Sequence, residues 1–168
     1  MCDYQLPLNI QLHDDATLSS FYPGNNEEVL EAVKHFAYDK EGKFLYIWGQ
    51  EGVGRSHLLQ AACHATSEVG DAAFYVPLLE QKQLSPGILQ GIDDISLVCL
   101  DDVNIIAGQP LWEEALFHLF NRIQAQNGRL LIAANISPIN LSVVLPDLKS
   151  RLTSGITYQV HRLSDEQK

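Results

Sequence analysis

The feature that most constrains this chain is a glycine-rich loop between a short apolar run and a segment with helical periodicity. The loop, residues 49–56, reads GQEGVGRS and fits the pattern G-x-x-x-x-G-K-[ST], except that Arg55 stands where lysine is expected. Residues 44–48 before it are those of a buried strand, and residues 58–63 after it carry apolar side chains at helical spacing. This order is the one that a phosphate-binding loop requires, because the loop N–H groups and the helix start together surround an anion.

Arg55 keeps a positive charge at the position that would meet the terminal phosphates of a nucleotide. A guanidinium is planar and wide, whereas the lysine ammonium is a compact point charge. We therefore expect nucleotide binding to survive this substitution better than hydrolysis. The alternative is that the glycines only allow a tight turn between a strand and a helix. The residues predicted to bind the nucleotide are Gly49, Gln50, Glu51, Gly52, Val53, Gly54, Arg55 and Ser56.

Two further apolar runs end in polar side chains. Residues 97–100 are followed by Asp101 and Asp102, an arrangement typical of a nucleotide site in which one carboxylate holds the magnesium shell and the second orients water. Ser56 and Asp101 are the predicted magnesium ligands. Residues 130–134 end at Asn135, whose amide is predicted to position the attacking water. The alternative for the two aspartates is that acidic residues at a strand end only solvate a loop.

Composition and charge narrow the class of protein. The 168 residues, of which 46% are hydrophobic, are enough for one domain with a single core. The formal net charge is -10, with 21 acidic against 11 basic residues, so direct specific DNA binding is not expected. The three cysteines are dispersed, which favours reduced thiols over a disulfide framework or a zinc site. There is no apolar run of 18 or more residues and no signal-like start, so we expect a cytoplasmic protein without membrane contact.

The alternation of apolar runs and helical segments predicts an α/β fold with a five-stranded parallel sheet and ligands at the carboxyl ends of the strands. Residues 16–163 are expected to form this nucleotide-binding domain. Residues 1–15 are predicted to be an arm in which Gln5, Leu6 and Leu8 form an extended peptide suited to an apolar groove, although an ordinary first strand is the alternative. Ser164 and Gln167 match a capping box, so residues 164–168 are expected to begin a further helix, which is truncated.

Seven segments carry a family resemblance: QLPLNI (5–10), SSFYPGNN (19–26), WGQEGVGRSHLLQAAC (48–63), LWEEALFHLFNRI (111–123), RLLIAAN (129–135), LPDLKSRL (145–152) and LSDEQK (163–168). Together they resemble the AAA+ ATPases of the DnaA type, and among them the Hda family of regulatory inactivators of DnaA. The resemblance implies a three-layer P-loop NTPase fold, the AAA+ base subdomain without its helical lid. It implies that residues 49–56 are Walker A, that Asp101 and Asp102 are Walker B, that Asn135 is sensor 1, and that Arg151 is an arginine finger acting on a neighbouring subunit's nucleotide.

The same resemblance implies a function and partners. It implies an adaptor that binds ADP or ATP, with magnesium, and that docks on the DNA polymerase III beta sliding clamp through Gln5, Leu6 and Leu8. Arg151 would then stimulate hydrolysis of the ATP bound to the initiator DnaA, which makes the adaptor a negative regulator of replication initiation with little turnover of its own. A homo-oligomer is left open. The competing hypotheses are a self-sufficient AAA+ ATPase, either helicase-loader-like or an initiator fragment, and a scaffold that binds no nucleotide.

Overall fold

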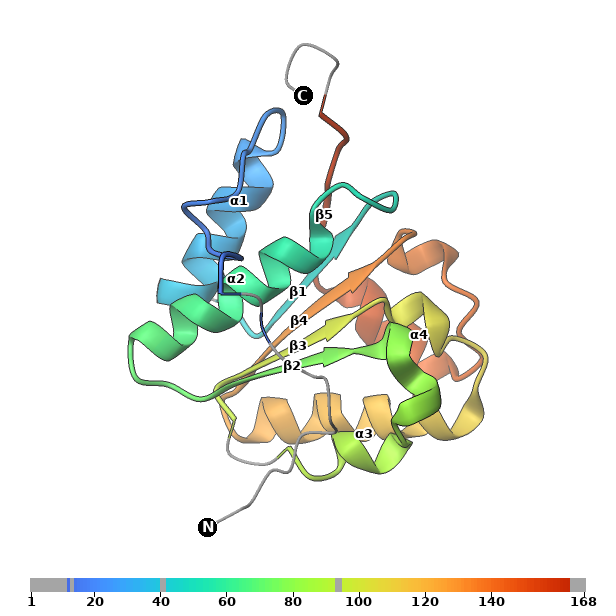
Figure 1. The fold of residues 1–168 in the computed structure, drawn as a ribbon. Helices are drawn as coiled ribbons and strands as arrows, with labels where there is room; N and C mark the ends of the chain where they lie inside the picture. The colour runs from blue at the N-terminus through green and yellow to red at the C-terminus, as the bar shows by residue number, and fades with distance from the viewer. Residues whose placement is uncertain (1–11, 13, 40–41, 93–94, 164–168) are drawn as a thin grey trace.

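The computed structural model describes residues 12, 14–39, 42–92 and 95–163, and it has the predicted α/β architecture (Figure 1). Five parallel strands form one sheet in the order β2-β3-β4-β1-β5. The peptide Gln5, Leu6 and Leu8 and the predicted helix start at 164–168 lie outside the described residues. The strands are β1 (Phe44–Trp48), β2 (Ala73–Pro77), β3 (Leu97–Asp101), β4 (Arg129–Ala134) and β5 (Ile156–Gln159).

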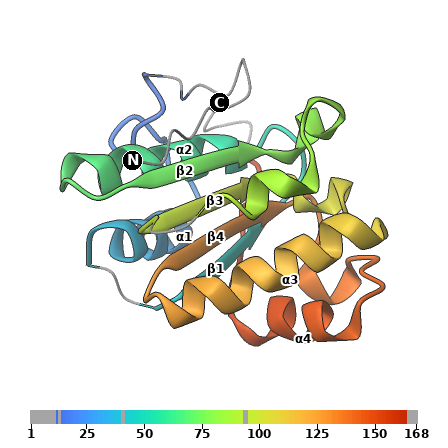
Figure 2. The same cartoon turned by 90° about the horizontal axis from the view of Figure 1, so that it is seen from below.

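Helices cover both faces of the sheet, as Figure 2 shows from below. Helices α1 (Glu27–Lys34) and α2 (Arg55–Glu68) pack on one face, and α3 (Pro110–Ala125) and α4 (Pro146–Ser154) pack on the other. Within the described ranges, no helix combines the length and apolar composition needed to cross a membrane. Helix α1 continues into a π-helical turn at His35–Asp39, and short 3₁₀ helices lie at Leu78–Gln83, Pro86–Leu89, Val103–Ile105 and Pro138–Asn140.

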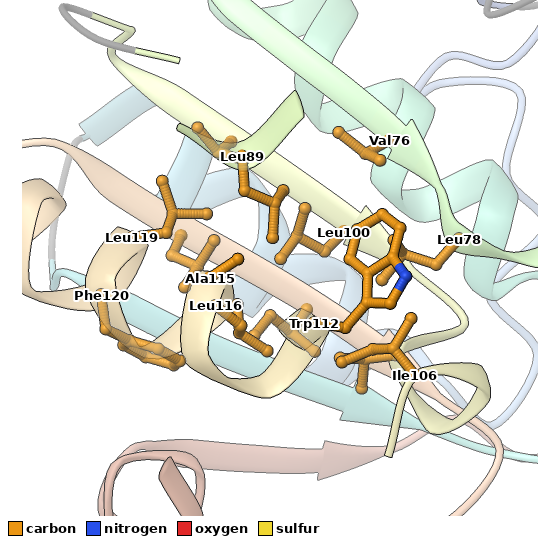
Figure 3. Packing of buried hydrophobic residues seen from close by; sticks show 14 of the residues in the cluster. Val76, Leu78, Leu89, Leu100, Ile106, Trp112, Ala115, Leu116, Leu119 and Phe120 are labelled. Atoms are coloured by element: carbon orange, nitrogen blue, oxygen red, sulfur yellow. The ribbon is translucent and has the colours of Figure 1, made fainter. Parts of the chain in front are cut away.

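The core consists of two apolar layers separated by the sheet. Successive side chains of a strand point to opposite faces, so Leu45 and Ile47 of β1 join the layer under α1 and α2, while Tyr46 joins the layer under α3 and α4. All residues of β3 and β4 are buried, because a parallel sheet that helices cover on both faces has no solvated side. Figure 3 shows the second layer, in which side chains of α3 pack against strand and loop residues; the labelled side chains include Trp112, Leu116, Leu119, Val76, Leu100 and Ile106.

One buried carboxylate holds the start of α4 against α3. Glu113, in the first turn of α3, is 1% exposed. Its carboxylate accepts hydrogen bonds from the backbone N–H groups of Gly108 at 2.5 Å, Val144 at 3.0 Å and Leu145 at 2.7 Å. A buried carboxylate is tolerated only when hydrogen bonds satisfy it, and these three donors belong to the two loops on either side. Glu113 therefore fixes the loop before α3 to the loop before α4.

Replacing Glu113 is expected to destabilise the domain. Glu113→Ala would leave these three N–H donors without their acceptor and should lower the free energy of unfolding by about 2 to 4 kcal/mol, and Glu113→Gln by about half of that. Urea denaturation followed by circular dichroism measures both. Glu114→Gln, on the neighbouring exposed position, is the matched control and should stay within about 0.5 kcal/mol of the unchanged protein. Equal stability of the Glu113 and Glu114 variants would contradict this role.

Candidate nucleotide site

The predicted phosphate-binding loop leaves the carboxyl end of β1 and enters α2 at Arg55. Gly52 and Gly54 have φ angles of +84° and +103°, which glycine adopts far more readily than residues with a side chain. A Cβ atom on Gly54 would lie 2.8 Å from Cε2 of Phe21, and one on Gly49 would collide with the carbonyl oxygen of Val160. The glycines thus allow the loop backbone to lie directly against neighbouring segments.

Two cavities flank the loop. The first, of about 520 Å³, joins loop residues to residues that follow β3 and β4, as predicted from their order in the sequence. The second, of about 470 Å³, lies between the loop, the segment before α1 and the residues after β5. The first cavity is lined by Glu51, Gly52, Gly54, Arg55, Ser56, His57, Leu79, Asp102, Asn104, Ile105 and Asn135. The second is lined by Ser20, Phe21, Tyr22, Glu51, Gly52, Val53, Gly54, His57, Arg162 and Leu163.

Asp101, the last residue of β3, is tied to the loop helix. The Ser56 hydroxyl donates a hydrogen bond to Asp101 Oδ2 at 2.5 Å, and the Tyr75 hydroxyl of β2 donates to the same oxygen at 2.6 Å. Burial, and after it the nearby Asp101 carboxylate, raise the pKa of Tyr75, so this phenol stays a donor. The other carboxylate oxygen, Oδ1, is buried and has no hydrogen-bond partner. The predicted magnesium ligands Ser56 and Asp101 are therefore neighbours.

The oxygens at this position suit a magnesium ion that a nucleotide brings with it. Mg²⁺ takes hard oxygen ligands and is usually held by one or two protein groups together with phosphate and water. The Ser56 hydroxyl and the Asp101 carboxylate, whose Oδ1 atom is buried without a hydrogen-bond partner, fit that donor set. Among the residues that the structure describes, no group of three or more His, Cys, Asp or Glu side chains could hold a metal ion. The remaining ligands would have to come from the nucleotide and from water.

Arg55 contacts Asp102. The Nη2 atom of Arg55 lies 3.4 Å from Oδ1 of Asp102, and the two side chains are 9% and 19% exposed. Nη1 of Arg55 is buried without a hydrogen-bond partner. Arg55 lines the first cavity, as the loop pattern predicts, but its guanidinium is mostly buried beside an acidic side chain of the same protein.

Asp102 has an unusual backbone conformation. Its φ and ψ of 58° and 47° are left-handed, a region that aspartate and asparagine tolerate better than most other residues. Burial raises the pKa of the Asp102 carboxyl, the Asp101 and Glu51 charges raise it further, and the Arg55 guanidinium opposes them. Because the chain turns sharply here, the Asp102 side chain leaves the strand direction and lines the cavity beside Arg55.

Asn135 lies at the edge of the first cavity. It follows β4, and its backbone N–H donates to the side-chain oxygen of Asn104 at 3.0 Å. Asn104 belongs to the 3₁₀ turn after Asp102, so this bond holds the end of β4 to the segment that follows β3. The phosphate-binding loop, the two aspartates that follow one another at the end of β3, and Asn135 therefore come together at the carboxyl edge of the sheet.

Arg151 lies elsewhere. It is half-buried on α4, where Nη1 donates to Gln124 at 3.0 Å, Nη2 donates to Asn121 at 3.1 Å, and the guanidinium lies 6.0 Å from the Phe117 ring centroid. All three partners are on α3, and Arg151 does not line either of the two cavities beside the loop. The structure thus separates Arg151 from the other predicted site residues.

Sequence reasoning missed several residues at the site. Tyr75 reaches Asp101 only because β2 and β3 are paired, and no sequence motif signals that contact. The ring Nε2 of His57 lies 2.8 Å from the Thr17 carbonyl oxygen and 3.1 Å from the Ser20 hydroxyl, and Phe21 packs edge-on against the same ring. The position of His57 directly after the Walker pattern was the only available hint.

The comparisons with known proteins identify the family and the fold. Residues 12–159 match the bacterial DnaA ATPase domain. A replication initiator DnaA bound to AMPPCP and single-stranded DNA is 26% identical, with a TM-score of 0.78 over 89% of this chain and 51% of that one. Protein NMB1076 from Neisseria meningitidis is 30% identical over 72% of this chain and 76% of its own, with a TM-score of 0.56. The DnaC helicase loader, 21% identical with a TM-score of 0.65 over 87% and 97% of the two chains, shows a shared fold.

The chain spans about half the length of the initiator chains that it matches. The family match covers most of the sequence and includes the loop, both aspartates, Asn135 and Arg151. The five-stranded parallel sheet with helices on both faces matches the fold of those solved structures. This chain therefore belongs to the bacterial DnaA ATPase domain family of AAA+ proteins.

Proposed function

We propose that this chain is a nucleotide-bound adaptor that restrains replication initiation and has little ATP turnover of its own. The observation that carries the proposal is the contact between Arg55 and Asp102, 3.4 Å apart. In a hydrolysing site of this class the loop cation contacts the terminal phosphates and the second acidic residue helps to orient water. Here the two groups neutralise each other, which favours holding a nucleotide over hydrolysing it.

The proposed nucleotide is ADP. The loop N–H groups and the start of α2 would bind its phosphates, and the second cavity leaves room beside the loop for the rest of the molecule. Ser56 and Asp101 would hold magnesium, which supplies positive charge against the phosphate oxygens. Support comes from the similar initiator bound to AMPPCP.

Arg151 is the proposed arginine finger, acting on the ATP of the initiator DnaA. Two side-chain amides and the Phe117 ring hold its guanidinium, so little side-chain freedom remains to be lost when it meets a phosphate. Its position away from both cavities favours action on a partner's nucleotide. A guanidinium supplied in this way raises turnover by roughly 10³ to 10⁵ in this class of reaction.

The proposed second partner is the DNA polymerase III beta sliding clamp, which Gln5, Leu6 and Leu8 would bind as an extended peptide. The described residues that follow this arm contact the loop helix, since Thr17 and Ser20 both lie within hydrogen-bonding distance of His57. An arm attached at this place would connect the clamp to the nucleotide domain.

Ser56→Ala tests the nucleotide part of the proposal. It removes one proposed magnesium ligand and should weaken ADP binding in the presence of magnesium by about tenfold, with little change when EDTA is present. Isothermal titration calorimetry measures both conditions. The matched control is Ser67→Ala, an exposed serine at the far end of the same helix. Equal losses with and without magnesium would contradict the ligand role, and no ADP binding by the unchanged protein would overturn the nucleotide proposal.

Arg151→Ala tests the action on the initiator. With clamp loaded on DNA and ATP-bound DnaA, the unchanged chain should stimulate ATP hydrolysis, and the alanine variant should lose about 100-fold or more of that stimulation. Asn121→Ala removes one anchor of Arg151 while keeping the guanidinium, and it should retain most of the stimulation. Phosphate release measures turnover. Full stimulation by the Arg151 variant would reject the finger role, whereas turnover by this chain alone that Asp101→Ala abolishes would favour the self-sufficient ATPase.

The arm makes a separate prediction. Combined Gln5→Ala and Leu8→Ala substitutions should weaken clamp binding at least tenfold, because they remove an amide and an apolar anchor from the docking peptide. Surface plasmon resonance on immobilised clamp measures the affinity, and a peptide of residues 1–15 should compete with the whole chain. Nucleotide affinity of the same variant serves as the control for folding. Unchanged clamp affinity would reject the arm as a docking peptide.

A further inference from the structure

We propose that Asp102 is the internal counter-ion of Arg55, and that this ion pair makes the nucleotide site prefer a diphosphate over a triphosphate. The inference rests on the nucleotide binding proposed above. It assigns to Asp102 the role of a specificity-determining residue, in place of the water-orienting role that its position after β3 suggests.

Arg55 and Asp102 contact each other within the folded chain. Both side chains are largely removed from solvent, and Asp102 Oδ1 lies 3.4 Å from Arg55 Nη2. The other terminal nitrogen of Arg55, Nη1, is buried and has no hydrogen-bond partner, so Asp102 is the acidic side chain that this guanidinium contacts. An ion pair in this setting is screened much less than one at the surface.

The backbone of Asp102 supports the pairing. A left-handed residue at the end of a buried strand costs conformational energy and persists only where the surrounding structure holds it. The 3₁₀ turn Val103–Ile105 follows directly, and its Asn104 side chain is bonded to the backbone of Asn135. The turn after β3 is thus anchored on both sides, and this anchoring keeps the Asp102 carboxylate beside Arg55.

The charges around the first cavity explain why the Arg55–Asp102 pair would disfavour a third phosphate group. Glu51 and Asp102 line the cavity, and Asp101 accepts a hydrogen bond from Ser56 of the same lining. Among the residues that the structure describes, Arg55 is the one arginine or lysine in this lining. With Arg55 matched to Asp102, the remaining charge on these groups is negative. A third phosphate group would add negative charge here, and it could gain the Arg55 cation only by leaving the largely buried Asp102 carboxylate unpaired. A diphosphate has no third phosphate group, so its binding leaves the contact between Arg55 and Asp102 intact.

Removing the Asp102 charge should release Arg55 for the terminal phosphate. Asp102→Asn preserves the shape of the side chain and tolerates the left-handed backbone. In the presence of EDTA, which removes any contribution of Asp102 to a metal site, the affinity for AMPPCP relative to ADP should rise about tenfold. Isothermal titration calorimetry with each nucleotide measures the ratio. Glu114→Gln, which removes an exposed charge on α3, should leave the ratio unchanged.

A second substitution tests the pair from the other side. Because Arg55 is engaged with Asp102 in the unchanged protein, Arg55→Gln should alter the affinities for ADP and AMPPCP by the same factor. In the Arg55→Gln background, Asp102→Asn should no longer change the ratio by tenfold, since no cation remains to be released. Thermal unfolding of each variant reports on folding, and the Arg55→Gln comparison stands if the Asp102 variant does not fold.

The outcomes separate this inference from the proposed function. If the unchanged protein binds ADP and AMPPCP equally well, or if Asp102→Asn leaves their ratio unchanged, the counter-ion role is wrong while nucleotide binding stands. If Arg55→Gln weakens AMPPCP at least tenfold more than ADP, Arg55 already meets the third phosphate and the role is also wrong. If the unchanged protein binds neither nucleotide, both this inference and the proposed function are overturned.

Discussion

The arrangement of the site depends on the buried carboxylate of Asp101. A carboxylate that is 2% exposed is strongly unfavourable unless donors satisfy it, and its donors are the hydroxyls of Ser56 and Tyr75. Those two residues belong to α2 and β2, so one group joins the loop helix to two neighbouring strands. Rotating α2 would remove Ser56 from Asp101 and leave the carboxylate undersatisfied. The same interaction that stabilises the packing therefore also fixes the position of the loop before α2.

Because Asp101 is held in place, the backbone of the next residue, Asp102, can adopt few conformations. The chain must leave the sheet without continuing into the cavity, and Asp102 does so in a left-handed conformation followed at once by a 3₁₀ turn. That turn carries Asn104 to the end of β4 and the Asp102 side chain to Arg55. Asp101 and Asp102 therefore have different roles. Asp101 joins structural elements through hydrogen bonds, and Asp102 balances the cation of the loop.

The strands and the location of the site can be predicted from the sequence. The side-chain contacts between residues that lie far apart in the chain cannot. The strands were evident because β1, β3 and β4 read as continuous apolar runs, as strands covered on both faces must. The meeting of the loop, Asp101 and Asn135 follows from the parallel order, since carboxyl ends of parallel strands share one edge. The contact of Arg55 with Asp102 joins residues far apart in the chain and depends on one backbone angle, which no periodicity reveals. The same holds for Tyr75 and for the loops that Glu113 joins.

The direction of α3 explains why Arg151 lies away from the candidate nucleotide site of its own chain. Helix α3 returns from the carboxyl end of β3 to the amino end of β4, so its last turn lies at the edge of the sheet opposite the loop. Gln124 in that turn accepts a hydrogen bond from Arg151 and, through its backbone carbonyl, from Lys43, which precedes β1. Arg151 is therefore held toward the amino edge, while the loop residues gather at the carboxyl edge. This position away from the loop of its own chain supports the proposed action of Arg151 on the nucleotide of a second molecule.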